Sequence, residues 1–474
     1  MLSKTRFFFS TNNVVLNTLA QSKVSTLSLA PKVKFNLSLL YSSLRPARYY
    51  STIPIKSAYT STISKEIAGK SIRPSRVISS KSTAWWLFGT SGLVFGIVVL
   101  GGLTRLTESG LSITEWKPVT GSIPPLNQEQ WEEEFNKYKE SPEFKQLNSH
   151  ITLDEFKFIF SMEWGHRLVG RGIGMFFILP ALYFWKTGKF SSRVTKRVFG
   201  LTCLLGLQGV IGWWMVKSGL DEEDLVERNS KPTVSQYRLT THLGAAFLMY
   251  LGVLWTGFEI LNENKWLKQA TKVPEKVTTI FAQLNNPALK KMRVYGYGLL
   301  ALAFITAMSG GMVAGLDAGL IYNTFPHMGD EYIPSTNELM SPVYARKADK
   351  SDMWWRNLLE NPTTVQLVHR ILATATFFSV VAAHVYVARR KAIVPRSALV
   401  MARAVMGVVT LQVTLGITTL IYLVPIPLAA AHQAGALALL TACLAFSAKL
   451  KRPRPQAMKF INNAMKSQLL KAKV

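Results

Sequence analysis

The chain has 474 residues, of which 48% are hydrophobic and only 17% are charged. Its apolar residues gather into runs of about twenty, long enough to cross the ~30 Å hydrocarbon core of a bilayer. The sequence therefore predicts a polytopic membrane protein. The formal net charge of +28 would suit nucleic-acid binding only as a continuous basic face. Here the charge falls in an N-terminal leader and in alternate loops, which argues against a nucleic-acid partner.

Residues 1–65 have the composition of a mitochondrial transit peptide. They contain nine Lys or Arg, many Ser and Thr and no acid, and the first acidic residue is Glu66. Basic, hydroxyl-rich segments without acids are typical of import signals. We expect a processing region near residues 48–51 and leave this leader out of the fold prediction.

Eight apolar segments follow the leader, and each is long enough to span the membrane as a helix. They lie near residues 84–104, 156–185, 199–216, 239–258, 294–314, 364–388, 398–424 and 427–448. An even number of spans puts both chain ends on the same side of the membrane.

The charge of the connecting segments predicts which side that is. Segments 186–198, 389–397 and 449–474 carry five, four and eight basic residues and no acid, whereas the other long loops are rich in acids. The acid-rich loops are 105–155, 217–238 and 315–363. Because Lys and Arg accumulate on the side from which spans insert, we expect both termini in the matrix and the acidic loops in the intermembrane space of mitochondria.

The second half of the chain repeats landmarks of the first half in the same order. The pairs are Gly101-Gly102 with Gly310-Gly311, His166-Arg167 with His369-Arg370, Leu207 to Gly212 with Leu411 to Gly416, and His242 with His432. Four spans per half make the repeat parallel rather than inverted. The predicted fold is an all-α polytopic membrane protein with eight transmembrane helices in two tandem, parallel-repeated four-helix bundles. The predicted parts after the leader are 66–260, a matrix linker 261–293, 294–448 and a basic matrix tail 449–474.

Four of the seven histidines lie on the second and fourth span of each half, at matching positions. Pairing within each half joins His166 with His242 and His369 with His432. Two imidazoles on facing helices of a bundle can ligate a heme iron axially. The alternative is that each histidine only forms hydrogen bonds between helices, but two register-matched pairs favour ligation. Zinc or non-heme iron would recruit cysteine or carboxylate ligands, which these spans almost lack.

Small residues near these histidines could make room for a macrocycle. Gly165, Gly170, Gly172 and Gly174 surround the first histidine, and small residues also follow His242 and His432. Arg167 and Arg370 directly follow ligands and could neutralise heme propionates.

Glu163 is the one acid of 27 that lies well inside a predicted span. It precedes His166 by three residues, one helical turn, so both side chains share nearly the same helix face. An intramembrane carboxylate is costly and is a functional hypothesis by default. The equivalent residue in the second half is Gln366, which suggests that the two halves do different work. The alternative is a structural salt bridge from Glu163 to Arg167 at i+4.

Three stretches resemble the signature of the heme A synthase family. They are Gly101 to Ser112 (GGLTRLTESGLS), Trp116-Lys117-Pro118 with Ile123-Pro124-Pro125, and Glu163-Trp164-Gly165-His166-Arg167. The resemblance runs from about residue 84 to 448 and includes all four paired histidines in order. Some bacterial members carry a cysteine pair in the loop after the first span, but residues 105–155 contain no cysteine.

The resemblance implies oxidation of the C8 methyl group of heme O to a formyl group, giving heme A for cytochrome c oxidase. It implies that His166 and His242 hold the substrate heme, that His369 and His432 hold a heme b that passes electrons, and that Glu163 acts at the reacting methyl. Glu163 could there stabilise a developing cation or accept a proton. Candidate partners under this resemblance are the inner membrane, heme O synthase, a ferredoxin-type electron donor and further copies of the chain.

Two other functions fit part of the pattern. A di-heme b electron-transfer protein explains the paired histidines equally well, but it does not explain Glu163 opposite Gln366. A transporter explains the repeat, but its expected broken helices with mid-span proline are largely missing. The charged segment 128–147 is predicted to lie at the membrane surface or to form a solvated helix.

Overall fold

The computed structural model describes residues 76–117 and 120–471, and the predicted leader at 1–65 lies outside this part of the chain. Within it the chain is helical and no β-strand forms. Eight helices are long and apolar enough to cross a membrane. They are α2 (Lys81–Leu106), α4 (Leu153–Lys186), α5 (Ser192–Leu220), α7 (Gln236–Lys272), α9 (Leu289–Gly315), α12 (Pro362–Ala388), α13 (Arg396–Ile421) and α14 (Ile426–Leu450). The prediction of an all-α polytopic protein with eight spans is thereby confirmed.

Local sequence signals mark where several of these helices begin. The α4 helix starts after a capping box in which Thr152 and Glu155 satisfy each other's backbone N–H groups. Proline stands in the first turn of α12 and of α14, where its missing N–H costs no helical hydrogen bond. At 34 and 37 residues, α4 and α7 reach about 50–55 Å at 1.5 Å per residue. The α7 helix therefore extends well past its predicted apolar segment 239–258, whereas α4 exceeds its predicted segment 156–185 by only a few residues.

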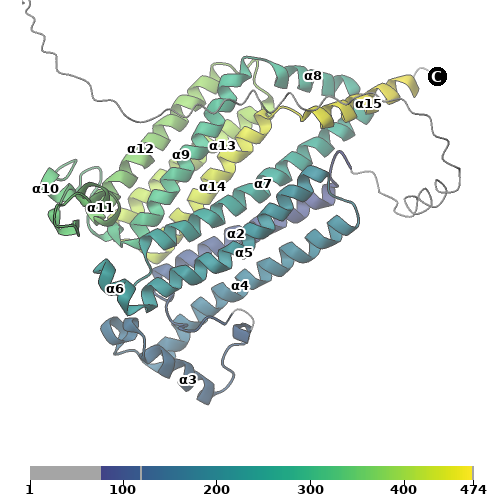
Figure 1. The fold of residues 1–474 in the computed structure, drawn as a ribbon. Coiled ribbons are helices and arrows are strands. Elements are labelled where there is room, and N and C mark those ends of the chain that lie inside the picture. The colour runs from purple at the N-terminus through teal and green to yellow at the C-terminus, as the bar shows by residue number, and fades with distance from the viewer. Residues whose placement is uncertain (1–75, 118–119, 472–474) are drawn as a thin grey trace, which may run out of the picture. The chain divides into compact units, whose positions relative to one another are not determined.

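The spanning helices contact one another mainly within each half of the chain. Helices α2, α4, α5 and α7 pack together, and so do α9, α12, α13 and α14 (Figure 1). The two groups meet through α2, α7, α9 and α14. This grouping follows the repeated landmarks of the sequence.

Glycines let the two groups approach closely at matching positions. A Cβ atom on Gly102 of α2 would lie inside the side chain of Gln433 from α14, whose Nε2 donates to the Val98 carbonyl at 3.0 Å. A Cβ atom on Gly311 of α9 would lie 3.2 Å from Leu243 of α7. Only a residue without a side chain leaves this room, so both second glycines of the repeated Gly-Gly pairs serve the contact between halves.

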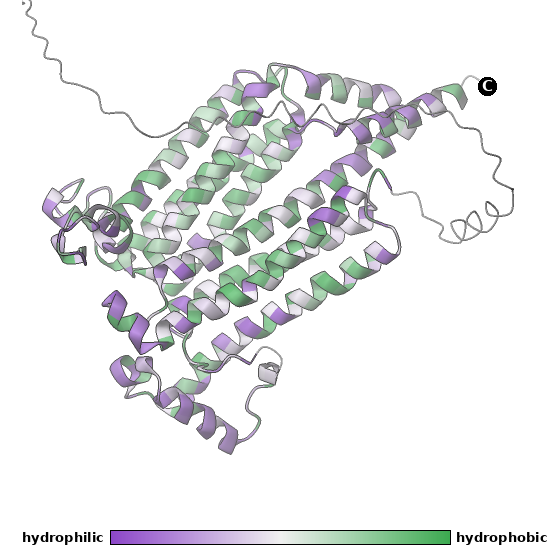
Figure 2. Cartoon of the chain, viewed as in Figure 1, coloured by the Kyte–Doolittle hydropathy of each residue, from purple (hydrophilic) through white to green (hydrophobic). Residues whose placement is uncertain are grey.

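The shorter helices gather at the two ends of the spanning helices, with α3, α6, α10 and α11 at one end and α8 and α15 at the other (Figure 1). Figure 2 shows apolar residues along the spanning helices and hydrophilic residues toward these ends. The short elements are η2 (Thr120–Ser122), α3 (Gln128–Lys139), η3 (Phe144–Asn148), α6 (Glu222–Arg228), α8 (Pro274–Asn285), η4 (Ala318–Leu320), α10 (Thr336–Leu339), η5 (Pro342–Tyr344), α11 (Met353–Glu360) and α15 (Pro455–Lys471). The end with α3 carries the acid-rich loops, so we call it the acidic-loop end.

Three segments differ in detail from the prediction. The linker 261–293 is nearly all helix, made by the end of α7, α8 and the start of α9, and the tail 449–474 contains α15. In the segment 128–147, the aromatic residues Phe135 and Tyr138 are buried against Phe156 and Phe160 of α4. Charged residues outnumber apolar ones in this segment, so its hydropathy does not reveal the packing.

A network of buried ion pairs fastens α15 to the end of α7. Arg454 donates to both carboxylate oxygens of Glu263, at 2.5 and 2.6 Å, and Glu259 pairs with Arg197 and Lys451. The side chains of Glu263 and Arg454 are 3% and 10% exposed. A buried acid of this kind depends on its cation, since desolvation otherwise penalises the charge.

We expect Arg454→Ala to destabilise the protein by about 3 kcal/mol, because it leaves Glu263 buried without its bidentate partner. Thermal unfolding of the purified protein in detergent measures the effect. Arg452→Ala is the control, because Arg452 is exposed and donates only to a backbone carbonyl. Equal unfolding temperatures for the two variants would show that the pair does not hold this end of the fold.

Candidate functional site

One large cavity lies among the spanning helices toward the acidic-loop end. Its volume is about 1910 Å³, and all eight spanning helices contribute to its lining. Sites for single small molecules usually measure about 300–1,000 Å³, so this cavity has room for two large ligands. His166, His242, His369 and His432 all line it.

The four histidines lie near the same end of their helices. His242 and His432 each follow the first residue of α7 and α14 by six positions, and His369 follows that of α12 by seven, about 10 Å of helix. His166 lies 13 positions into α4, whose first turns extend into the loop layer. Both histidine pairs therefore lie toward the acidic-loop end of the spanning helices.

Each histidine ring rests against a glycine of a neighbouring helix. A Cβ atom built on the glycine would lie 2.8–3.2 Å from the imidazole Cε1 in all four cases. The contacts are Gly101 with His166, Gly212 with His242, Gly310 with His369, and Gly416 with His432. Since any larger residue would displace the ring, we call these four residues the seat glycines. They occupy the repeated landmarks of the sequence.

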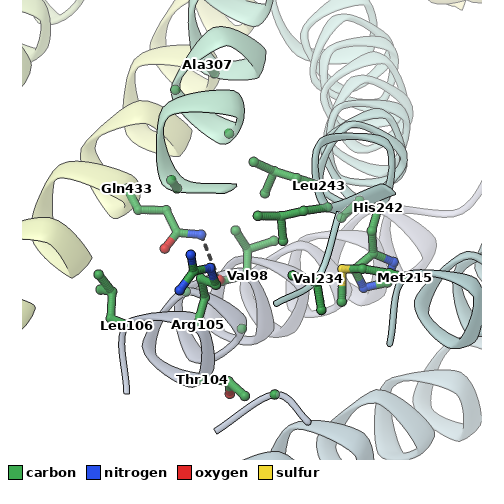
Figure 3. A pocket seen from close by; sticks show the side chains of 18 of the residues that line it. Val98, Thr104, Arg105, Leu106, Met215, Val234, His242, Leu243, Ala307 and Gln433 are labelled. Atoms are coloured by element: carbon green, nitrogen blue, oxygen red, sulfur yellow. Dashed lines mark hydrogen bonds between the residues drawn. The ribbon is translucent and has the colours of Figure 1, made fainter. Parts of the chain in front are cut away.

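The imidazoles within each predicted pair interact electrostatically, His166 with His242 and His369 with His432. The Nδ1 atoms of His166, His242 and His432 are buried and have no hydrogen-bond partner among the described residues. Figure 3 shows His242 beside Met215 at the cavity wall. Rings that are buried without satisfied nitrogens are costly, which favours a ligand-binding role over hydrogen bonding between helices.

The other three histidines do not line the cavity. His150 lies in the loop before α4, and His327 stacks on Tyr332 with ring centroids 4.0 Å apart. His384 lies 3.3 Å from the Ala402 carbonyl through Nδ1. No trio of His, Cys, Asp or Glu in the described residues is placed to hold a bare metal ion.

Glu163 lines the cavity and is only 3% exposed. One oxygen of its carboxylate pairs with Arg167 at 2.6 Å, so the alternative salt bridge does form. The other oxygen accepts from the Ser112 hydroxyl at 2.8 Å and from the Ile113 N–H at 2.9 Å. Arg167 in turn donates to the carbonyls of Ile113 and Glu115. Glu163 therefore fixes the loop after α2 across the mouth of the cavity.

Gln366 makes the equivalent arrangement in the second half. Its Nε2 donates to the carbonyls of Ala318 and Tyr322 in the loop after α9, and its Oε1 accepts from Arg370 at 3.1 Å. Arg370 also donates to carbonyls of this loop. The two halves thus share one loop clamp, charged in the first half and neutral in the second.

Two details of the sequence prediction change. Of the glycines expected to make room, Gly170 and Gly174 line the cavity, whereas Gly165 and Gly172 do not. Arg167 and Arg370 line the cavity, but most of their N–H groups serve the loop clamps, which leaves little for a propionate.

The sequence did not point to two further cations near the mouth of the cavity. Arg105 and Lys231 line the cavity and meet at Asp317, at 2.7 and 3.0 Å, and the buried Arg105 Nε has no hydrogen-bond partner in the part of the chain that the structure describes. Figure 3 shows Arg105 beside Gln433, between the two halves of the chain. A single sequence gives no sign of this, because Arg105 and Asp317 are 212 positions apart.

Comparison with known proteins identifies the family to which this chain belongs. Residues 84–444 match the COX15-CtaA family of cytochrome oxidase assembly proteins. The chain belongs to the heme A synthase family. Heme A synthase COX15 of Saccharomyces cerevisiae is 61% identical over 425 residues, which cover 88% of this chain and 87% of that protein. Human heme A synthase COX15 is 42% identical over 403 residues, 84% of this chain and 90% of that protein.

A heme A synthase-mitochondrial ferredoxin fusion protein of Schizosaccharomyces pombe is 51% identical over 384 residues. The match covers 81% of this chain and 62% of the fusion protein.

The residues around the cavity fit the hemes that this family implies. The lining is mostly apolar, four imidazoles face the cavity, and cations gather at the mouth. Planar macrocycles with an iron centre and two acidic side chains need these three features.

Glu143 is a further buried acid of the cavity lining and lies in the loop before α4, outside the spanning helices. It accepts a hydrogen bond from the Tyr138 hydroxyl at 3.0 Å, and no ion pair to it forms among the described residues. Burial, together with the nearby Glu163 and Glu108, raises the pKa of Glu143 to about 8. Among the described residues Glu163 is one of five buried acids, with Glu143, Glu259, Glu263 and Asp352.

We expect Glu143→Gln to flatten the pH dependence of stability. A folded-state pKa near 8 lies above the ordinary value of 4.5, so the native state binds the extra proton, and wild-type stability falls as pH rises from about 4.5 to 8. Across this window the free energy of unfolding of the variant rises relative to that of wild type, by about 1.4 kcal/mol per pH unit. Thermal unfolding between pH 5 and 8 measures this, with the exposed Glu140→Gln as control. Parallel curves for Glu143→Gln and wild type would contradict the prediction.

Proposed function

We propose that the chain is a heme A synthase that oxidises the C8 methyl group of heme O to a formyl group in successive steps. The observation that carries this proposal is a single cavity lined by two histidine pairs. Each half also has a loop clamp beside its pair, and the clamp residue is the charged Glu163 in the first half and the neutral Gln366 in the second. The names of the relatives support the same activity.

We assign the two halves different work. The first half, 66–260, holds the substrate through His166 and His242, and the second half, 294–448, holds heme b through His369 and His432. Heme b, when bound, supplies a one-electron carrier beside the substrate. Both pairs line one cavity, which supports electron transfer between neighbouring sites rather than across the membrane.

Glu163 acts on the substrate by its charge. Its oxygens already accept three hydrogen bonds, and a carboxylate has about four acceptor positions. Fixed negative charge in a water-poor cavity stabilises positive charge that develops as the methyl group is oxidised. Between the two roles that the sequence allows, this geometry supports charge stabilisation over proton acceptance.

Cations at the mouth neutralise the propionates of the two hemes. Arg167 and Arg370 contribute through their remaining N–H groups, and Arg105 and Lys231 are better placed because they serve fewer backbone carbonyls. Charge-assisted hydrogen bonds of this kind are about twice as strong as neutral ones.

The chain resides in the mitochondrial inner membrane with both termini in the matrix, as its loop charges favour. The acidic-loop end and the cavity then face the intermembrane space. The fusion of a relative with a mitochondrial ferredoxin supports a ferredoxin-type electron donor for this chain.

We expect Glu163→Gln to keep heme b and to lower heme A formation by at least about 100-fold, the usual effect of losing one preorganised charge. The amide oxygen can still accept from Ser112 and Ile113 in the loop after α2, so the change removes charge with little change in shape. Heme A is measured by extraction from cells that make heme O. The matched control is Gln366→Ala, which keeps activity. Wild-type activity of Glu163→Gln would limit Glu163 to the loop clamp.

The activity itself is tested by acid-acetone extraction of the purified protein, followed by chromatography with mass detection. Heme B together with heme O, its hydroxylated product or heme A supports the synthase. His369→Ala should lower the heme B content, because it removes one of its ligands. Heme B alone, from a strain that makes heme O, would favour a di-heme b electron-transfer protein instead.

A further inference from the structure

Ser309 lies on α9 directly before the seat glycine Gly310. Its Oγ lies 2.8 Å from the Nδ1 atom of His369, and the same hydroxyl donates to the Thr306 carbonyl at 2.7 Å. Two consecutive residues of α9 thus position His369, one by leaving room for the ring and one by a hydrogen bond.

The hydrogen count at Ser309 favours one tautomer of His369. A serine hydroxyl has one hydrogen, and a carbonyl oxygen can only accept. The contacts with Thr306 and His369 are both hydrogen bonds only if the hydroxyl donates to the Thr306 carbonyl and Nδ1 carries the ring hydrogen and donates it to Ser309. The Nε2 atom then keeps its lone pair, which is the form of histidine that binds a metal ion.

The other three histidines of the cavity lack this partner. Their Nδ1 atoms are buried without a hydrogen bond among the described residues. The position equivalent to Ser309 in the first half, 209 residues earlier by the offset of Gly310 from Gly101, is Leu100. A leucine cannot accept from His166, so the first half does not fix its ring in the same way.

We propose that Ser309 is a positioning residue that makes the second half the site of the permanently bound heme. By accepting from Nδ1, Ser309 holds the His369 ring in one orientation and makes it a stronger electron donor. A stronger donor stabilises ferric iron and lowers the midpoint potential. Without such a partner, His166 gives a site from which product can leave. This inference rests on the proposed function, which assigns heme b to His369.

The test compares full-length Ser309→Ala with wild type, both purified in detergent. We expect a more positive midpoint potential for the heme B signal in an optical redox titration. We also expect about 10-fold weaker retention of heme B on dilution, the usual lower bound for losing an outer hydrogen bond of a metal ligand. A purely structural role would not move the potential of the heme that remains.

Ser309→Thr should restore the wild-type potential, because threonine keeps the hydroxyl. Ser309→Cys keeps the size but offers a weak acceptor, and it should shift the potential in the same direction as alanine even if Ser309→Ala does not accumulate. The matched control is Leu100→Ala at the equivalent position, which should leave the heme B potential unchanged.

The outcomes separate the two ideas. Wild type without a low-spin heme B overturns the proposed function and this inference with it. Wild type with heme B, but with the same potential and retention in Ser309→Ala and Ser309→Cys, overturns only the role of Ser309.

Discussion

The contact between a histidine ring and a glycine on the next helix is the constraint on which the cavity depends. Membrane helices normally pack closely enough to leave no space for a macrocycle, yet helices pushed wholly apart would not position ligands. A seat glycine allows each imidazole-bearing helix to stay in contact with its neighbour while the ring edge faces the cavity. Since this contact recurs four times, all eight spanning helices can line one cavity and still form a packed protein.

The loop clamps add the second constraint, which is electrostatic. Charge buried near a membrane interior is tolerated only with close partners, and Glu163 has Arg167 and two donors from the loop after α2. Gln366 clamps the corresponding loop of the second half with the opposite polarity, because its amide donates to loop carbonyls. A loop clamp can therefore form without a carboxylate, and the negative charge at this position belongs to the first half alone. That difference is the strongest reason to connect Glu163 with chemistry.

Hydropathy and repetition predicted the eight spans and the histidine pairs because both are recorded along the chain. The tertiary neighbours of a side chain cannot be read from the order of residues along the chain. Gly170 and its neighbours were expected to make room for a heme because they lie close to His166 along the chain. The residue that contacts the ring is instead Gly101, which lies 65 positions earlier and was noted only as part of a repeated motif. Arg167 was assigned to propionates for the same reason, since its loop carbonyl partners lie more than fifty positions away. The aromatic packing of α3 was not predicted because it rests on a few apolar residues among many charges, and α15 was not predicted because its apolar residues form no run long enough to span a membrane.

A parallel repeat supplies two equivalent sites, but a synthase that oxidises a heme needs two unequal ones. The substrate must enter and the product must leave, whereas an electron carrier must stay. The scaffold keeps what both need, namely the paired imidazoles, the seat glycines and the loop clamps. It varies two positions beside the rings, Glu163 opposite Gln366 and Leu100 opposite Ser309. Glu163 adds a charge at the proposed substrate site, and Ser309 adds a hydrogen bond to a histidine of the proposed site of the permanently bound heme. Both differences agree with the proposed assignment of the halves, and they rest on independent contacts, so the proposal has a physical argument beyond family membership.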